Sequence, residues 1–383
     1  MIEHKVIENI KYGVKSVKAI ALTHNNIPLV LPSAFLLHTA VNSLSFETVR
    51  TYMNTMKSFY SEITSKTNLS NYNIEDLSDP EMSGYLVGIL KREKKLKSST
   101  IEHHISVLRE FFKYIFNAGL VSNEPIFSYA YQENETEQTY LQGITTDMHE
   151  AYFDKTEFKE CLLTNVLATS NFVITRNELV LKLGYFAGFR SAEVIHPYNL
   201  NIKKLRKLLP ERDSFLPRSI HMTVYGKGSI FREVPFPPNL IQSIYDFIWG
   251  EGSHLTSGNI ICREKGIPLK DKSFASKLFR KCADEHCLRN ELTDIEITLW
   301  NNRSYHKLRK CFATNGVTDC RDNGDDPWIY IPQWLGHANK GTTFKYIYFE
   351  ALLNKRQSLL HKLSLESTKY GKKFKKVTNK NGL

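Results

Sequence analysis

Long apolar runs are missing from this sequence of 383 residues. Its longest mostly apolar stretch, residues 27–37, is interrupted by Pro28 and Pro32. It falls well short of the ~18 residues that a membrane-spanning helix requires. Nor does the segment after Met1 resemble the apolar region of a signal peptide. We therefore expect a soluble, cytoplasmic protein.

Cysteine is also scarce, with six residues in the chain. Six thiols in a chain of this length do not form a disulfide scaffold, so we expect them to be reduced. Cys282, His286 and Cys287 lie close together, but they lack the Cys-x-x-Cys spacing, and no second pair follows at the distance of a zinc finger. We expect no metal site.

Acidic residues are outnumbered, 40 against 51 Lys and Arg, which gives a net charge of +11. The first 130 residues carry a net +2, residues 131–170 a net −6, and residues 171–383 a net +15. A basic second half predicts a polyanionic partner. The acidic stretch, with the polar run 132–138, predicts a linker over residues 131–154.

Hydrophobic residues (42%) and aromatic residues (12%) are plentiful enough for packed cores, and the length predicts two or three domains. In the first half, Ser45 can cap a helix whose apolar residues then recur every three or four positions. Those residues are Val49, Tyr52, Met56, Phe59 and Ile63. A second helix is expected from Asp79, and a third from a capping box of Ser99 with Glu102. Residues 41–130 are therefore predicted to be a helical bundle.

The basic run 91–97 at the end of the second helix has two interpretations, a solvated helix end or a DNA contact. Residues 1–40 are expected to form an N-terminal segment, with a small hairpin over 15–31. Pro28 would keep the second strand of that hairpin at an edge.

The second half is predicted to be one domain, residues 155–365, followed by a basic tail, 366–383. Helical patterns cover 155–195, 239–249, 272–290 and 304–363. Residues 220–235 change to the alternating period of a β-hairpin, with Gly226 and Gly228 supplying the turn geometry.

Four short motifs in this half carry polar side chains suited to catalysis. They are Gly188-Phe-Arg190-Ser-Ala-Glu193, Gly226-Lys227-Gly228, His306-Lys-Leu-Arg309, and Leu335-Gly336-His337 followed nine residues later by Tyr346. Each alone has an ordinary structural explanation, such as a one-turn ion pair between Arg190 and Glu193. Their order and spacing together are far more specific.

Taken together, these motifs resemble those of the tyrosine recombinase (phage integrase) family. The resemblance covers about residues 150–365, and more weakly 41–130, which is similar to the helical core-binding domain of the family. It implies a mainly α fold with a small antiparallel β-sheet, arranged as a two-domain DNA clamp. Lys310-Cys311 and Gly341 depart from the commoner residues of the family, and they replace none of its catalytic side chains.

The resemblance also implies a role for each side chain. Arg190 and Arg309 would hold the scissile phosphate, since a guanidinium is planar, bidentate and always charged. Tyr346 would attack the phosphorus, and His306 would help to remove its proton. Lys227 would protonate the leaving 5′-oxygen. The list is completed by His337, which would hold a phosphate oxygen or orient the nucleophile, and by Glu193, which would support the site.

Two other tyrosines compete for the role of nucleophile, Tyr348 and, more distantly, Tyr330. On a helix, residues 346 and 348 point ~200° apart, so only one of them can face the phosphate. The interval from His337 favours Tyr346.

The function implied by the resemblance is site-specific cleavage and rejoining of double-stranded DNA, with integration or excision of a mobile element. It needs no cofactor and no metal. We expect a homotetramer on two DNA sites, linked by exchange of the C-terminal helix, and association with the nucleoid when DNA is bound. The alternatives are DNA relaxation like that of a type IB topoisomerase, and DNA binding without catalysis.

Overall fold

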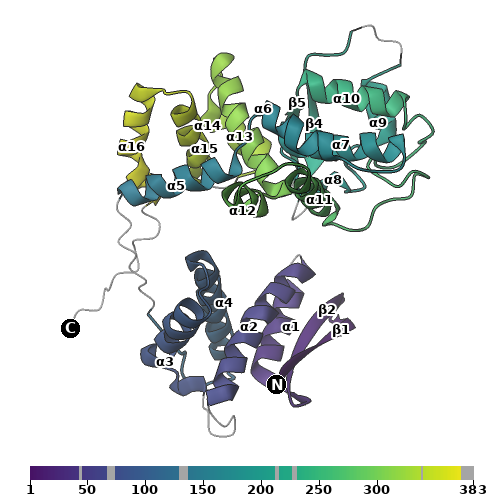
Figure 1. Ribbon diagram of the computed structural model, residues 1–383. Helices are drawn as coiled ribbons and strands as arrows, with labels where there is room; N and C mark the ends of the chain where they lie inside the picture. The colour runs from purple at the N-terminus through teal and green to yellow at the C-terminus, as the bar shows by residue number, and fades with distance from the viewer. Residues whose placement is uncertain are drawn as a thin grey trace. The chain divides into compact units, whose positions relative to one another are not determined.

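Helices make up most of the chain in its computed structural model, and two small antiparallel sheets accompany them (Figure 1). The structure describes residues 1–42, 45–66, 74–128, 137–211, 215–226, 231–337 and 340–371. The chain divides into two compact units, residues 1–132 and 133–383. The predicted fold class, mainly α with small antiparallel sheets, is confirmed. None of the described helices is long and apolar enough to cross a membrane.

The first unit begins with a three-stranded antiparallel sheet in the order β1-β2-β3. Its strands are β1 (Ile2–Tyr12), β2 (Lys15–His24) and β3 (Ile27–Pro28). The hairpin predicted over 15–31 is present as the short antiparallel pair of β2 with β3. The prediction missed β1, which pairs with β2 along nearly its whole length. Pro28 has no N–H for a ladder, and β3 ends there after two residues.

This sheet shares its core with the helices that follow it. Ile2, Ile20 and Leu22 are buried in one core with the helices that follow. Apolar side chains at the open end of the hairpin need this cover, so the sheet packs on α1 (Val30–Asn42) and α2 (Phe46–Lys66).

The predicted helical bundle continues with α2, α3 (Asp79–Ser83), the π-helical turn η3 (Gly84–Glu93) and α4 (Ser98–Asn117). Ser45 accepts a hydrogen bond from the N–H of Glu47 at 3.2 Å, in accord with its predicted cap. The predicted capping box at Ser99 was wrong, because α4 already begins at Ser98 and no side chain caps it. At the end of the second helix, Lys94 forms an ion pair with Glu62 at 2.8 Å.

The second unit begins inside the stretch that was predicted to be a linker, 131–154. Residues 137–151 form α5 (Glu137–Ala151). Its residues Ile144, Met148 and Ala151 recur at helical spacing and are buried, while the acidic residues Asp147 and Glu150 lie between them. Part of the charge of this stretch, on these two residues, therefore belongs to a packed helix.

The second unit also contains a hairpin of β4 (Ile220–Tyr225) and β5 (Phe231–Phe236), which confirms the strand pair predicted over 220–235. The helices before and around it are α6 (Lys155–Glu157), α7 (Asn171–Ala187), α8 (Ser191–Val194), α9 (Ile202–Leu208), α10 (Pro238–Trp249), α11 (Phe274–Arg289) and α12 (Asp294–Asn302). The last four are α13 (Tyr305–Asp322), α14 (Pro327–Leu335), α15 (Lys340–Leu353) and α16 (Gln357–Gly371).

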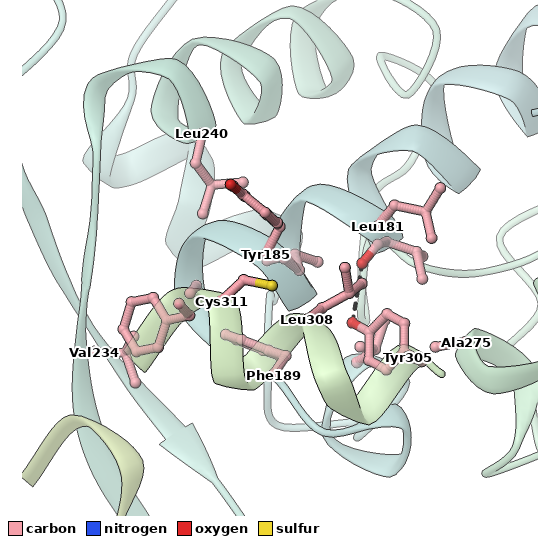
Figure 2. Packing of buried hydrophobic residues seen from close by; sticks show 14 of the residues in the cluster. Leu181, Tyr185, Phe189, Val234, Leu240, Ala275, Tyr305, Leu308 and Cys311 are labelled. Carbon is pink, nitrogen blue, oxygen red and sulfur yellow. Dashed lines mark hydrogen bonds between the residues drawn. The ribbon is translucent and has the colours of Figure 1, made fainter. Parts of the chain in front are cut away.

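The core of this unit lies where α7 meets α13. Figure 2 shows Tyr185, Leu308 and Val234 among the buried side chains that pack there. The Tyr305 hydroxyl donates to the Val180 carbonyl at 3.0 Å. Close approach depends on Gly184, because a Cβ at that position would lie 2.8 Å from Leu308 Cδ1. The contact between α7 and α13 brings the motif that begins at Gly188 close to the motif that ends at Arg309.

Candidate active site

The first motif follows the C-terminus of α7. Gly188 ends this helix in the left-handed region, with φ of 61°, and turns the chain into α8. Arg190 then donates from its backbone N–H to Glu193 Oε2 at 2.8 Å and from Nη1 to Glu193 Oε1 at 2.7 Å. The Arg190 side chain stays 37% exposed, whereas that of Glu193 is only 3% exposed. Glu193 thus holds an arginine that keeps one side open to solvent.

Arg309 lies on α13 and is buried. Its guanidinium donates to two backbone carbonyls, Gly188 O at the end of α7 and Leu335 O at the end of α14. These bonds bring the first, third and fourth motifs together. Burial, and then the positive charges of Arg232 and Arg190, lower the pKa of Arg309 to about 9.

His306 lies one turn before Arg309 on the same helix. Partial loss of hydration and the charges of Arg309 and Arg190 lower the pKa of His306 below its ordinary value of 6.5. The imidazole is therefore neutral at neutral pH, which is the form that can accept a proton.

His337 follows α14, which Gly336 ends with φ of 63°. Its Nδ1 lies 3.2 Å from Oγ1 of Thr343 on α15. Burial, followed by the charge of Arg309, lowers the pKa of His337 to about 4. A neutral imidazole is thus fixed between α14 and α15.

Tyr346 lies on α15, with its ring nearly parallel to that of His337. The two ring centroids are 6.1 Å apart and the planes differ by 17°. Burial raises the pKa of Tyr346 to about 12, although Arg309 and Arg190 act in the opposite direction. The phenol is protonated at neutral pH and must lose its proton in order to attack.

The two competing tyrosines have other neighbours. The Tyr348 ring stacks on Phe344, with centroids 5.9 Å apart, and the Tyr330 ring packs against Trp334 at 5.8 Å. Arg309 and Arg190 act on the pKa of Tyr346, whereas the pKa of Tyr348 is raised by burial alone. Tyr346 therefore faces the two arginines, as the interval from His337 predicts.

Lys227 falls among residues 227–230, between β4 and β5 in the sequence, and so lies outside the described residues. The role of Lys227 as the general acid stays a prediction.

Sequence reasoning missed three charged residues of this site. Arg232, on β5, forms two hydrogen bonds with the Glu193 carboxylate, at 2.8 and 2.7 Å. Lys345 Nζ lies 5.3 Å from the centroid of the Tyr346 ring, and Asp147 of α5 forms an ion pair with Lys310 at 2.6 Å. The alternation of Arg232 with buried Val234 and Phe236 could have placed this arginine on the inner face of the strand. Asp147 was hidden by the interpretation of its segment as a linker.

Within the described ranges, no three His, Cys, Asp or Glu side chains gather so that they could hold a metal ion. Cys282 is buried in the core of the second unit, and His286 packs against the Trp300 ring at 5.0 Å. What the site does assemble is the guanidinium groups of Arg190, Arg309 and Arg232, two neutral imidazoles and one phenol. Such a set can bind an anionic phosphodiester and supply a nucleophile to it.

Comparison with known proteins points the same way. No family model matches the sequence. The tyrosine recombinase XerC of Bacillus pumilus (strain SAFR-032) is 23% identical over 264 residues, which cover 66% of this chain and 72% of that protein. A tyrosine recombinase of Pseudothermotoga lettingae is 25% identical over 316 residues, covering 82% of this chain and 91% of that protein.

Among solved structures, the XerH site-specific recombinase bound to its palindromic difH substrate, in a post-cleavage complex, has a similar fold. The TM-score is 0.55 at 18% identity, and the match covers 85% of this chain and 83% of that one. The chain is therefore similar to tyrosine recombinases, both in its sequence and in its fold.

Proposed function

We propose that this chain is a site-specific recombinase that cuts and rejoins double-stranded DNA through a phosphotyrosine on Tyr346. The observation that carries the proposal is the meeting of Tyr346 with Arg309, Arg190 and His337, which come from four separate segments of the second unit. A tyrosine packed only for stability needs no such surroundings.

In the first step, the Tyr346 oxygen attacks the phosphorus, and the bond from phosphorus to the 5′-oxygen breaks. The phenolic proton passes to neutral His306, and Lys227 gives a proton to the leaving 5′-oxygen. The products are a 3′-phosphotyrosine and a free 5′-hydroxyl. In the second step, a 5′-hydroxyl gives its proton to Lys227 and attacks the phosphotyrosine, while His306 returns a proton to the departing Tyr346 oxygen. One phosphodiester is exchanged for another, so no ATP is needed.

The two arginines stabilise the charge on the non-bridging oxygens during both steps. Arg190 is the more open of the two, and N–H groups not used by Glu193 remain for a phosphate. Arg309 is fixed more deeply by Gly188 and Leu335, so it is already oriented before DNA arrives. Preorganised donors of this kind cost no rearrangement at the moment of reaction.

The biological outcome that we propose is integration or excision of a mobile element. The net +15 over residues 171–383 supports tight contact with DNA phosphates around the site. A plasmid assay with two candidate sites tests it: recombination between two plasmids supports integration. Relaxation of one supercoiled plasmid without a second site would instead indicate an activity like that of a type IB topoisomerase.

We propose further that the enzyme acts as a homotetramer on two DNA sites, linked by its C-terminal end. Within one chain, α16 packs on α5 and α15 and buries Leu363. A cavity of about 1120 Å³ beside α13 is lined by the aromatic rings of Tyr330 and Trp334 and by acidic side chains. Those acidic residues are Asp319, Asp322 and Asp325.

Lys155, Arg218 and His221 also line this cavity, so its charge is mixed. Exchange would place the Lys-rich and Phe-containing segment 372–376 of one copy against the aspartates and aromatic rings of this cavity in the next copy. Deleting residues 372–383 should leave single-site cleavage intact and weaken the assembly of two sites, measured as synaptic complexes on a native gel. Unchanged assembly would reject the exchange.

Formation of the covalent intermediate is the test of the enzyme itself. A nicked half-site should trap wild-type protein as an adduct on a denaturing gel, because the short 5′-fragment diffuses away. Tyr346→Phe should form none. Tyr348→Phe is the matched control on the same helix and should retain the adduct. Failure of the wild-type protein to form any adduct would reject the proposal.

A further inference from the structure

Arg232 is a buried arginine whose contacts join the parts of the proposed active site. Its side chain is only 5% exposed, and that of its partner Glu193 is 3% exposed. A buried guanidinium is costly unless its N–H groups are paired. The acceptors of the Arg232 N–H groups therefore show which parts of the structure this side chain connects.

Two of its hydrogen bonds go to one carboxylate. Nη1 donates to Glu193 Oε1 at 2.8 Å and Nη2 donates to Glu193 Oε2 at 2.7 Å. The same two oxygens accept the bonds from Arg190. The hydrogen bonds of Arg232 and the charges around it hold the pKa of Glu193 below its usual value, in spite of burial. Glu193 thus stays ionised, and Arg232 fixes the direction in which it holds Arg190.

Its other bonds go to the backbone that holds Arg309. Nη2 lies 3.4 Å from Gly188 O, which also accepts from Arg309. Nε donates to Trp334 O at 2.8 Å, and the carbonyl of the next residue, Leu335, is the second acceptor of Arg309. Arg232 therefore contacts the backbone at or next to both carbonyls that accept hydrogen bonds from Arg309.

The position of Arg232 in the hairpin adds a third connection. Arg232 pairs with Val224 in the β4–β5 ladder, next to the Tyr225–Phe231 pair from which the turn leaves. One side chain consequently ties together β5, the end of α7 with α8, and the end of α14.

We propose that Arg232 is a positioning residue that sets the directions of Arg190 and Arg309 toward the scissile phosphate. It lies behind these arginines and does not itself hold the DNA. A lysine would keep the positive charge but present a single nitrogen, which cannot form a bidentate pair with Glu193 and also reach Trp334 O. This inference rests on the proposed function, since it assigns the two arginines to a phosphate.

The test compares Arg232→Lys with wild type on two nicked half-sites. One carries the natural scissile phosphodiester, and the other a methylphosphonate, which lacks one charged non-bridging oxygen. Mutating the residues that orient metal ligands typically costs ~10-fold to ~100-fold in activity, and we take the same range for a residue that orients phosphate-binding arginines. We expect adduct formation by Arg232→Lys to slow by about that factor on the phosphodiester and by only a few-fold on the methylphosphonate, because less charge remains to be held.

Arg176→Lys is the matched control. Arg176 is also buried in the second unit, but it donates to Cys262 O and to Asn177, away from the proposed site. Any loss that comes only from weaker packing should be the same on both substrates. The proposal is overturned if Arg232→Lys cuts the phosphodiester at the wild-type rate, or if it slows equally on both substrates.

A binding measurement separates this inference from the proposed chemistry. With Tyr346→Phe, which removes the proposed nucleophile, the protein should bind the phosphodiester duplex more tightly than the methylphosphonate duplex. Adding Arg232→Lys should reduce that preference several-fold. If Arg232→Lys reduces the preference for the phosphodiester duplex, the positioning role of Arg232 is supported even if wild-type protein forms no adduct. An unchanged preference refutes that role.

Discussion

The turn at Gly188, between α7 and Arg190, offers a sharp test of the packing that carries the site. Replacing Gly188 by Ala adds two separate costs. The φ of 61° is unfavourable for a residue with a Cβ by roughly 1–2 kcal/mol. The new Cβ would also lie 2.5 Å from Cδ1 of Phe312 on α13, and overpacking of this kind costs about 1–3 kcal/mol. Together they predict a loss of about 2–5 kcal/mol in the free energy of unfolding.

Two other glycines separate these costs. Gly258→Ala has the backbone cost alone, because its φ is 82° and nothing lies within 4 Å of the new Cβ. Gly184→Ala has the packing cost alone, against Leu308 and Tyr305. Guanidinium chloride unfolding of the three variants should place Gly188→Ala near the sum of the other two losses. If Gly188→Ala is no less stable than Gly258→Ala, the close contact between the turn and α13 is refuted.

Three further predictions concern charge, pH and the C-terminal helix. Glu193→Gln leaves Arg232 buried without its carboxylate and should lower the free energy of unfolding by ~3–5 kcal/mol at pH 7. The pKa of Glu193 is lowered in the fold, so the stability that its ionisation adds is present above pH 4.5 and is lost as the pH falls through the folded pKa. The difference in the free energy of unfolding between Glu193→Gln and wild type should therefore shrink in acid. A difference that stays constant with pH would contradict the ion pair. The lowered pKa of His306 predicts that the rate of adduct formation stays level from neutral pH down to about 6.5 and falls only below it, and a midpoint above 6.5 in the pH–rate profile would exclude His306 as the base. Leu363→Ala should lower the free energy of unfolding by ~2–5 kcal/mol if α16 packs on its own chain, and should make the C-terminal end easier to cleave by protease. No change in either measurement would contradict the packing of α16 on its own chain.

Much of the fold was predictable because buried apolar residues recur every three or four positions in its helices and at every second position in its strands. Val49, Met56 and Phe59 mark the core face of α2, and all three are buried. The hairpin of β4 and β5 was predictable for the same reason, since alternate residues such as Met222 and Val224 face the core.

The errors arose where composition conceals packing. In α5, acidic side chains surround the buried face formed by Ile144, Met148 and Ala151, so the net charge indicated a linker. Most of β1 is exposed on both faces, and it therefore lacks the alternation that identifies a half-buried strand.

The candidate site was predictable as a set of motifs but not as a connected structure. The order of Arg190, His306, Arg309, His337 and Tyr346 along the chain carried the resemblance. The role of Arg232 could not be read in the same way, because its partners lie 39 residues before it and 102 residues after it. Only the folded chain brings Glu193 and Trp334 to one guanidinium.

The most direct measurement of the central claim is the identity of the residue joined to DNA. After reaction with a nicked half-site, the adduct can be digested with protease and nuclease and sequenced by mass spectrometry. The account predicts a nucleotide attached through its 3′-phosphate to Tyr346. A nucleotide on Tyr348 or Tyr330, or one joined through a 5′-phosphate, would contradict it.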